Sequence, residues 1–246
     1  MGQNLKIIDS LPSTNDYVKE QLANSKPFEE GTVIMANEQT EGRGQRGSVW
    51  KSSKGENLTF SYLLKPDFLP ASSQFLLTCS VSLGLVKFLK QYIPDVFIKW
   101  PNDIMAGNKK ICGILIENTL RGQNIKNAVV GIGLNVNQTE FPALISQATS
   151  LKKETSGTEN FNRELLLKDL LRFLSEEYYM LKNSSTKKIL KEYNEFLFMK
   201  HKDNVFLIDN QEVEAFLLDI EEDGFLRLKI EGEIKKYGLK EVKMLF

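Results

Sequence analysis

Lys99-Trp100-Pro101-Asn102-Asp103 is the most informative stretch of this sequence, and Lys110-Ile111-Cys112-Gly113-Ile114-Leu115 follows it after six intervening residues. The first segment is a polar turn whose groups can hold a nucleotide or a metal ion. The second segment carries a lysine into an apolar strand. A buried ammonium destabilises the fold or loses its proton unless an anion pairs with it. We therefore expect Lys110 to be buried, with a ligand supplying the negative charge.

Hydrophobic patterns around this stretch predict a mixed α and β core. β-branched and aromatic runs bounded by Gly, Pro or Asn predict strands; they cover residues 32–36, 57–64, 97–100, 111–117 and 128–136. Residues 74–92 repeat apolar side chains at helical spacing, which predicts a core-facing helix. Two further helical patterns cover 161–181 and 186–199, after a polar stretch, 149–160, that we expect to be a loop.

The hydrophobic pattern of the sequence changes from helical to strand-like after Met199. Short strand-like runs at 204–208, 213–220, 225–230 and 233–239 are separated by Asp209-Asn210, Asp223-Gly224 and Glu231-Gly232, at hairpin spacing. We therefore divide the chain into an α+β catalytic domain, 1–199, and a small barrel, 200–246. A β-extension of the main sheet is the alternative for the second segment.

Composition narrows the classes of function. The chain of 246 residues carries 32 basic and 32 acidic residues, so no global charge points to nucleic acid or a membrane surface, although local basic clusters are possible. We see no hydrophobic run that approaches a membrane span of about 20 residues, and no secretion signal, so we expect a cytoplasmic protein. His201 is the single histidine, which nearly excludes histidine-based zinc sites and catalytic triads. Any metal would be a hard cation on oxygen ligands, and Cys79 and Cys112 are expected to pack in the core.

A glycine-rich segment, Gly42-Arg43-Gly44-Gln45-Arg46-Gly47, matches the dinucleotide-binding pattern GxGxxG. That pattern requires a helix directly after the glycines, whereas here the chain leads through Trp50 into a predicted strand. The kinase and Walker readings also fail, because the accompanying motifs are missing. The alternatives that remain are a solvated turn and a cationic loop whose backbone amides approach anionic oxygens. Trp50 favours the second, since a large aromatic beside such a loop can cover a ligand.

Three weaker signals complete the candidate site. Ser13-Thr14-Asn15-Asp16 precedes a helical pattern and is typical of a helix N-cap, which also offers amides and hydroxyls to a small polar ring. Gln39 adds an amide. Gly131-Ile132-Gly133-Leu134-Asn135 ends a strand, where glycines indicate either a structural bulge or the close approach of a ligand.

Taken in order, these motifs resemble the biotin protein ligase family. The resemblance covers essentially the whole chain, and the segment KWPND followed by the lysine-glycine strand is its most specific part. It implies a class II synthetase-like core with a mixed or antiparallel sheet and flanking helices, and an SH3-like barrel at the C-terminus. It also implies an enzyme that activates biotin with ATP and Mg²⁺ as biotinyl-5′-AMP and transfers it to a lysine of a biotin carboxyl-carrier domain.

The resemblance also implies roles for residues of this chain. Lys110 and Arg43 would be catalytic, and Asp103 would contact magnesium. The expected biotin-binding residues are Ser13, Thr14, Asn15, Gln39, Gly42, Arg43, Gly44, Gln45, Trp50, Lys110 and Gly113. The expected nucleotide-binding residues are Arg43, Arg46, Trp50, Asn102, Asp103, Lys110 and Asn135. Many relatives carry arginine where this chain has Gln45. In this chain, binding of the adenylate would therefore depend more on Arg43 and Arg46.

Some members of the family carry an N-terminal DNA-binding winged helix, and the twelve residues before Ser13 are too few for one. We therefore expect no DNA binding. The nearest rival function is a lipoate or octanoate ligase, which would have less use for the polar cluster around Ser13 and Gln39. A second rival is a non-catalytic RNA- or protein-binding module that uses Arg43 and Arg46 as a basic patch. An exposed sheet edge would serve either a homodimer or the carrier domain.

Overall fold

The computed structural model describes residues 1–24, 28–142 and 147–245. Their largest element is a seven-stranded sheet in the order β1-β2-β3-β7-β6-β5-β4, in which β1 and β2 are parallel and the other neighbours are antiparallel. The strands are β1 (Leu5–Leu11), β2 (Val33–Gln39), β3 (Leu58–Leu64), β4 (Val96–Lys99), β5 (Asp103–Ala106), β6 (Lys109–Arg121) and β7 (Asn124–Leu134). The predicted mixed sheet is confirmed.

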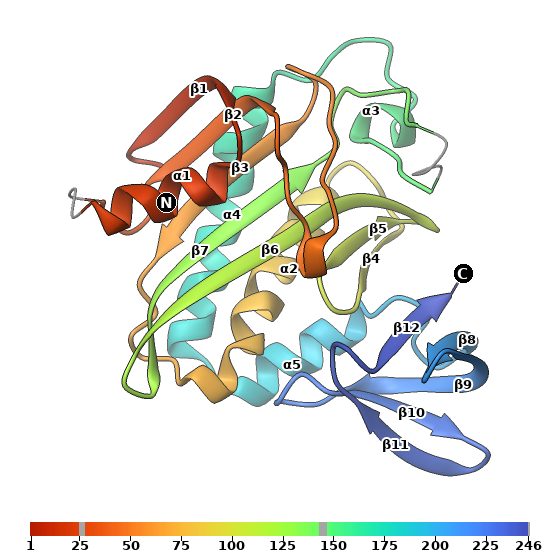
Figure 1. Ribbon diagram of the computed structural model, residues 1–246. Coiled ribbons are helices and arrows are strands. Elements are labelled where there is room, and N and C mark those ends of the chain that lie inside the picture. Colours follow the sequence, from red (N-terminus) through yellow and green to blue (C-terminus); the bar gives the residue numbers. More distant parts are fainter. Residues whose placement is uncertain (25–27, 143–146, 246) are drawn as a thin grey trace.

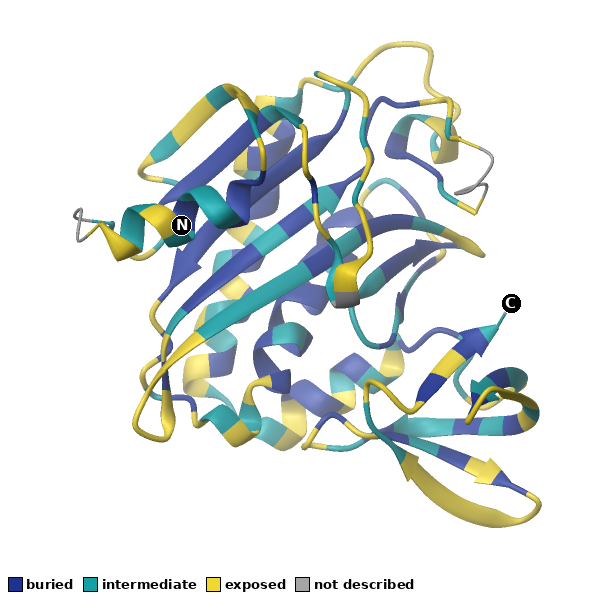
Figure 2. Cartoon of the chain, in the orientation of Figure 1, coloured by how far each residue is buried: buried dark blue, intermediate teal, exposed yellow. Residues whose placement is uncertain are grey.

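Side chains alternate between the two faces of this sheet, as strand geometry requires. On β3, Phe60 and Tyr62 point into the main hydrophobic core, whereas Leu63 belongs to a smaller cluster on the opposite face. On β7, Ile132 faces the main core and Val129 the smaller cluster. β3 is therefore buried along its length, whereas β6 and β7 alternate buried with partly exposed residues and are exposed at the ends that meet in their hairpin (Figure 2).

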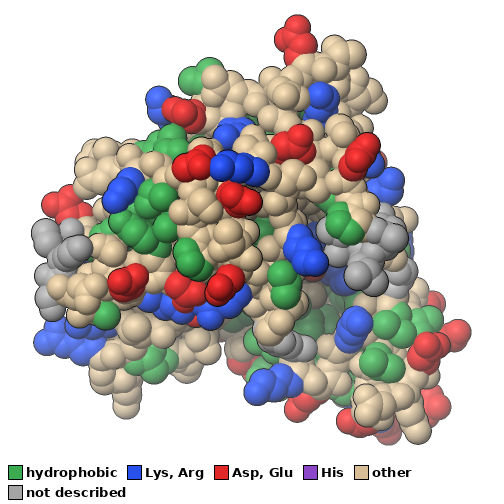
Figure 3. Space-filling view, turned by 45° about the horizontal axis from the view of Figure 1, so that its top comes forward, with side chains coloured by type: hydrophobic (Ala, Val, Ile, Leu, Met, Phe, Trp, Pro, Cys, Tyr) green, Lys and Arg blue, Asp and Glu red, His purple; other side chains and the backbone are tan. Residues whose placement is uncertain are grey.

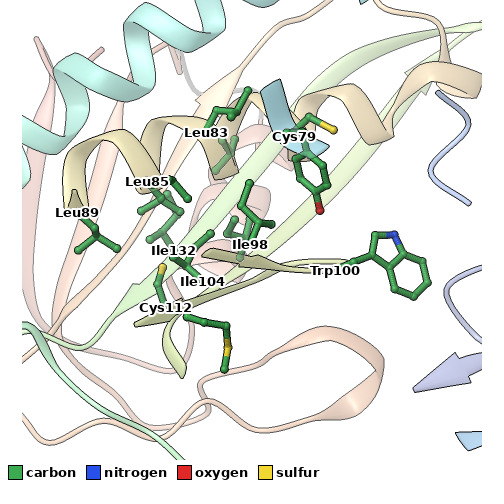
Figure 4. Packing of buried hydrophobic residues seen from close by; sticks show 14 of the residues in the cluster. Cys79, Leu83, Leu85, Leu89, Ile98, Trp100, Ile104, Cys112 and Ile132 are labelled. Atoms are coloured by element: carbon green, nitrogen blue, oxygen red, sulfur yellow. The ribbon is translucent and has the colours of Figure 1, made fainter. Parts of the chain in front are cut away.

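Helices cover both faces (Figure 1). The main core lies beneath α2 (Phe75–Leu89), which packs against α4 (Arg163–Asn183) and α5 (Thr186–Glu195). Figure 4 shows Leu85 of α2 beside Ile104 and Ile132 of the sheet. On the other face, α1 (Thr14–Ala23) buries Val18 against Ile34, Leu63 and Val129.

The apolar character of α2 corrects one sequence-based expectation. Residues Ala71–Leu89 are long and apolar enough to cross a membrane by length and composition, although we saw no such run in the sequence. In the structure 72% of this segment is buried inside the protein. Both faces of α2 are covered, by the sheet and by α4 and α5, which explains why this core helix is apolar all round.

A second, five-stranded antiparallel sheet follows, in the order β11-β10-β9-β8-β12. Its strands are β8 (Asp203–Ile208), β9 (Gln211–Ile220), β10 (Leu226–Ile230), β11 (Glu233–Tyr237) and β12 (Val242–Leu245). This separate sheet is consistent with an SH3-like domain and rules out an extension of the main sheet. The boundary between residues 199 and 200 stays a prediction.

Two hydrogen-bonded contacts join the second sheet and its loops to the rest of the chain. Trp100 Nε1 donates a hydrogen bond to the carbonyl of Gly224 over 3.1 Å, and Trp100 lies at the end of the main core nearest the C-terminal strands (Figure 4). Asn194 of α5 makes a pair of hydrogen bonds with the backbone of Ile220, at 2.8 and 2.9 Å. Trp100 belongs to the KWPND segment, so the position of the second sheet is set beside that turn.

Most predicted elements are confirmed, with shifted ends. The structure adds three strands that the sequence did not suggest, β1, β5 and β12, and a short helix, α3 (Leu151–Glu154), inside the stretch expected to be a loop. The helix predicted to reach residue 199 ends at Glu195, and Leu197 then pairs with Ile98 at the edge of β4. Cys79 and Cys112 are free and buried, as expected.

Candidate active site

Small residues form the floor of the candidate site. Gly113 of β6 and Gly133 of β7 are directly paired, and Gly133 is paired in turn with Thr59 of β3. Gly131, one step along the same face of β7, is paired with Ser61. No large side chain therefore covers this part of the sheet from within, and groups from neighbouring segments can lie directly on the backbone.

The start of α1 supplies a polar cluster on this floor. Ser13 caps the helix by accepting a hydrogen bond from the amide of Asp16, as predicted. Thr14 donates two hydrogen bonds to Gln39 Oε1, from its amide over 2.8 Å and from Oγ1 over 2.9 Å. Ser61 Oγ lies 2.6 Å from both Thr14 Oγ1 and Asn15 Oδ1. These side chains are therefore oriented before any ligand arrives.

Asn15 is held from its other side as well. Its Nδ2 donates to Glu117 Oε2 over 2.8 Å, and Lys19 pairs with the second oxygen of the same carboxylate over 2.7 Å. Asn15 lies so close to Gly131 that a Cβ there would overlap its amide group. Because the amide is held at both ends and against the strand, its orientation is determined.

The glycine-rich segment forms a closed loop in front of the sheet (Figure 1). Arg43 and Val49 form a β-bridge, and a 3-10 turn, η1 (Gln45–Gly47), lies between them. Gly42 must be glycine because a Cβ would strike the carbonyl of Trp50, whose amide bonds to the Gly42 carbonyl over 2.9 Å. No α-helix follows the loop, which agrees with our rejection of the dinucleotide-binding reading.

Arg43 and Arg46 are the charged residues of this loop. The guanidinium of Arg43 forms an ion pair with Asp16 in the first turn of α1, which fastens the loop to the polar cluster. The side chain of Arg46, a predicted nucleotide contact, lies outside the described part of the structure.

Trp50 lies on the glycine floor. A Cβ at Gly133 would come within 2.6 Å of Trp50 Cζ2 and 2.7 Å of Nε1, and a Cβ at Gly113 within 3.2 Å of Cζ3. The indole Nε1 is buried and has no hydrogen-bond partner among the described residues. A buried donor without a partner costs stability, so this nitrogen is available to a ligand acceptor.

Lys110 sits beside this indole. Its Nζ lies 5.7 Å from the centre of the Trp50 ring and 2.6 Å from Asp103 Oδ1. The expectation of a buried Lys110 is wrong: 36% of its side chain is exposed, and its anionic partner is Asp103. The reason is the register at the β5/β6 bulge, which places Lys110 at the cavity wall beside the turn that carries Asp103.

Lys99, the lysine of the KWPND turn, was not among the predicted site residues, but it lines both cavities. Burial lowers the pKa of Lys99 to about 8; the charge of Asp103 opposes this, and the charges of Lys110 and Lys243 add to it. Lys99 and Asp103 are paired across β4 and β5. The three lysines and one aspartate therefore share a single electrostatic environment.

Asn102 and Asn135, the two asparagines predicted to face the nucleotide, make different hydrogen bonds. Asn102 Nδ2 donates to the carbonyl of Ile114 over 2.7 Å, and the Ile114 amide bonds back to the Asn102 carbonyl, so Asn102 pins the KWPND turn to β6. Asn135 Nδ2 donates to the carbonyl of Thr149 over 2.9 Å, and its side chain lies at the wall of a separate cavity.

Two adjoining cavities meet at this place. The first, of about 410 Å³, contains the polar cluster, and the second, of about 510 Å³, contains Asn135 and Phe141. Both are lined by Val49, Trp50, Lys99, Asp103 and Lys110. Asp103 is the acidic residue that lines them among the described residues. The hollow between the main body and the second sheet is visible in the space-filling view, with basic side chains at its rim (Figure 3).

The structure therefore brings together nearly all of the predicted site. The first cavity is lined by every expected biotin-binding residue except Gly42, whose role is to let the loop close. Sequence reasoning missed Ser61, Lys99 and the part of the cavity wall that the second sheet supplies, and it left open whether Gly131 marks a bulge or a site. The alternation of small residues with core residues on β3 was a usable signal for Ser61. No local pattern marked the contribution of the second sheet.

The sequence profile of the biotin/lipoate A/B protein ligase family matches residues 7–135. The chain belongs to this family. The matched region contains the floor, the polar cluster, the glycine-rich loop, Lys110 and Asn135, and ends before the second sheet.

Individual relatives agree with this membership. The chain is 32% identical over 197 residues to the bifunctional ligase/repressor BirA of Bacillus subtilis; the match covers 78% of this chain but 59% of that protein. It is 26% identical over 235 residues to a biotin–[acetyl-CoA-carboxylase] ligase of Mycobacterium tuberculosis, covering 94% and 85% of the two chains. The biotin protein ligase of Aquifex aeolicus, solved in complex with biotin and ATP, superposes with a TM-score of 0.83 at 27% identity and 99% coverage of both chains.

Proposed function

We propose that this protein is an ATP-dependent biotin ligase of the biotin/lipoate family. It activates biotin as biotinyl-5′-AMP and transfers the acyl group to a lysine of a biotin carboxyl-carrier domain. The single observation that carries the proposal is the meeting of two cavities at Lys110. One holds preset hydrogen-bonding side chains, the other is lined by Asn135 and aromatic and apolar groups, and a cation stands where they join.

The first cavity suits the bicyclic head of biotin. A ureido ring needs both donors and acceptors, and the cluster of Ser13, Thr14, Asn15 and Gln39 presents both. Leu115, which lies opposite Gly131 on the cavity face of β6, adds an apolar group to the lining of the same cavity. The Aquifex structure with biotin and ATP supports this assignment through its similarity over the whole chain.

The second cavity suits the nucleoside, and the two substrates would meet at the lysine. In the first step an oxygen of the biotin carboxylate attacks the α-phosphorus of ATP, and the bond from that phosphorus to the β-phosphate oxygen breaks, releasing pyrophosphate. Lys110 stabilises the negative charge that builds on the phosphoryl oxygens. A carboxylate is already a nucleophile, so correct placement is the main requirement of this step.

In the second step the amine of the carrier lysine attacks the acyl carbon of the adenylate. The bond from the acyl carbon to the phosphate oxygen breaks, AMP leaves, and the amine gives up a proton. Trp50 and the loop around Arg43 cover the place where the adenylate would lie, which excludes water from a reactive anhydride.

Magnesium fits this site as a companion of the phosphates. Among the described residues, no group of three or more His, Cys, Asp or Glu side chains is placed to hold a metal ion. Mg²⁺ commonly keeps several waters and binds one or two carboxylates together with substrate phosphates. Asp103 would be that carboxylate, and the bound ion would neutralise part of the triphosphate charge.

The proposal also includes a carrier domain as the protein partner and the cytoplasm as the location. The outer edge of β4 is occupied by Leu197, whereas β1 is the other edge strand of the main sheet and is the candidate edge for a carrier domain or a second copy. Two free, buried cysteines suit a reducing compartment such as the cytoplasm.

Mass spectrometry of the carrier tests the proposal. Incubation of the protein with biotin, ATP, Mg²⁺ and a biotin carboxyl-carrier domain should add one biotinyl group to the carrier. A carrier whose acceptor lysine is replaced by arginine should gain none. An unmodified carrier, with no pyrophosphate released, would refute the proposal.

Lipoate is the competing substrate, because the family description covers both acids. Pyrophosphate release with biotin and with lipoate at equal concentrations distinguishes them. We expect biotin to be preferred, since lipoate has no ureido group and would make no hydrogen bonds with the polar cluster around Thr14 and Asn15. A preference for lipoate would assign the protein to the other branch of the family.

A further inference from the structure

Glu117 lies at the end of the glycine floor, on the face of β6 that α1 covers. It follows Gly113 and Leu115 at alternate positions, so the three residues share one face of the strand. Glu117 is paired with Val129 of β7, which belongs to the small hydrophobic cluster that packs against α1. Glu117 lines neither cavity. Its carboxylate therefore acts on the site through other side chains.

Asn15 is the side chain that Glu117 holds. Its Nδ2 donates to Glu117 Oε2 over 2.8 Å and to the carbonyl of Leu115 over 3.3 Å. Its Oδ1 faces the other way, where it accepts a hydrogen bond from Ser61 Oγ over 2.6 Å and lies nearest to the place of a Cβ at Gly131. The donor end of the amide is thus taken up by the protein, while its oxygen is turned toward the polar cluster of the first cavity.

Lys19 holds the carboxylate of Glu117 in place. Lys19 Nζ lies 2.7 Å from Glu117 Oε1 and 2.9 Å from Asp16 Oδ1. Burial lowers the pKa of Lys19, but hydrogen bonds to the two carboxylates outweigh this effect and raise the pKa above its ordinary value. A carboxylate paired with a lysine only accepts hydrogen bonds. Asn15 must therefore turn Nδ2 toward Glu117, since an amide oxygen there would face negative charge.

We propose that Glu117, held by Lys19, is a positioning residue that makes Asn15 present its oxygen to the ring N–H groups of the substrate. This inference rests on the proposed function and deepens it, because it states how the first cavity selects a cyclic urea. An amide oxygen has two lone pairs, so Asn15 Oδ1 can accept one hydrogen bond from Ser61 and a second from a ring N–H. With the amide turned over, its NH₂ group would face the N–H donors of the ring.

Steady-state kinetics of pyrophosphate release test the inference. Glu117→Ala should raise the KM for biotin about tenfold, the effect of losing one hydrogen bond to a charged group. The KM for ATP should stay the same, and kcat should change little. Glu117→Gln keeps an oxygen that can accept from Asn15, so it should raise the KM for biotin only about threefold. An unchanged KM for biotin, or an equal rise in the KM for ATP, would overturn the inference.

Glu192→Ala is the matched control. The side chain of Glu192 on α5 is 31% exposed, as is that of Glu117, and each pairs with a lysine over 2.7 Å. Glu192 lines neither cavity. The two alanine variants should therefore lower the Tm by similar amounts, but Glu192→Ala should leave the KM for biotin unaltered. Equal KM values in the two variants would reduce Glu117 to a structural role and refute the inference.

A substrate analogue separates recognition of the urea from the general shape of the cavity. Desthiobiotin keeps the cyclic urea and lacks the sulfur ring, so Glu117→Ala should raise its KM by the same factor of about ten. Lys19→Met changes a half-exposed side chain and leaves Glu117 in place, and it should raise both KM values about threefold. If the KM for desthiobiotin is unaffected while that for biotin rises, Glu117 does not act through the urea and the inference fails.

Direct binding of biotin without ATP, measured by calorimetry, keeps the inference distinct from the proposed function. The unaltered protein should bind biotin about ten times more tightly than Glu117→Ala. If the carrier is never biotinylated but this difference is found, the proposed function fails and the positioning role stands. If the carrier is biotinylated but both proteins bind biotin equally, the inference is refuted.

Discussion

The indole of Trp50 lies on the backbone of Gly133, where a Cβ would come within 2.7 Å of the ring nitrogen. The relationship joins a loop residue to the central strand of the main sheet. This contact requires that residue 133 has no side chain. The ammonium of Lys110 lies 5.7 Å from the centre of the same indole ring. The geometry of the candidate site therefore depends on a glycine that takes no part in any chemistry.

We predict that Gly133→Ala displaces Trp50 and lowers the rate of adenylate formation about tenfold, since overpacking costs about 1–3 kcal/mol. The shift should also change tryptophan fluorescence, because Trp50 and Trp100 are the two tryptophans of the chain. Gly157→Ala is the control, since its Cβ would meet its nearest neighbour at 3.4 Å, an ordinary contact. Unchanged fluorescence and activity in Gly133→Ala would show that the contact has no role.

Lys110→Met should reduce kcat for pyrophosphate release by about 10²–10³, the loss typical of one group that stabilises transition-state charge. The neighbouring exposed residue provides the control: Lys109→Met removes the same charge one position away and should leave the rate unaltered. Single-turnover measurement of biotinyl-5′-AMP checks both variants. Similar rates in Lys110→Met and Lys109→Met would contradict the proposed chemistry.

Ser61→Ala should raise the KM for biotin while changing kcat little, because Ser61 Oγ orients Thr14 and Asn15 and does not line the cavity. Loss of a buried partner costs about 1–3 kcal/mol, so the Tm should fall as well. Thr59→Val separates the effect on the KM for biotin from the effect on the Tm. It removes a buried hydroxyl on the same strand, bonded to the Ala36 carbonyl, and should lower the Tm without changing the KM for biotin. Equal KM values in the two variants would refute a positioning role.

Arg43→Ala should release biotinyl-5′-AMP into solution and label lysines on bystander proteins. Arg43 lines the first cavity and ties the loop to Asp16 of α1, so its loss removes both a cation and the fastening of the loop. Labelling of added serum albumin, detected with a biotin-specific probe, is the measurement. Arg121→Ala, an exposed arginine at the end of β6, should label no more than the unaltered protein. The same result for Arg43→Ala would contradict this prediction.

Most of the fold was predictable because its elements carry strong local patterns. The apolar residues of β3, β7 and α2 result from burial in the core, and each run is long enough to be recognised without coordinates. β1 was missed because it is an edge strand in which Lys6, Asp9 and Ser10 interrupt the apolar positions. β12 has only four residues, and its pairing with β8 joins positions more than thirty residues apart in the chain.

The sequence by itself determined the membership of the candidate site, because Ser13, Thr14, Asn15, Gln39, Trp50, Asp103 and Lys110 all line the cavities. Their residue types and order are local properties that can be read without coordinates. The tertiary structure decided that Lys110 is half-exposed and paired with Asp103, that Trp50 lies on Gly133, and that Lys243 reaches the same cavity. These relationships depend on strand register and on the docking of two sheets, which are set by packing between segments far apart in the chain.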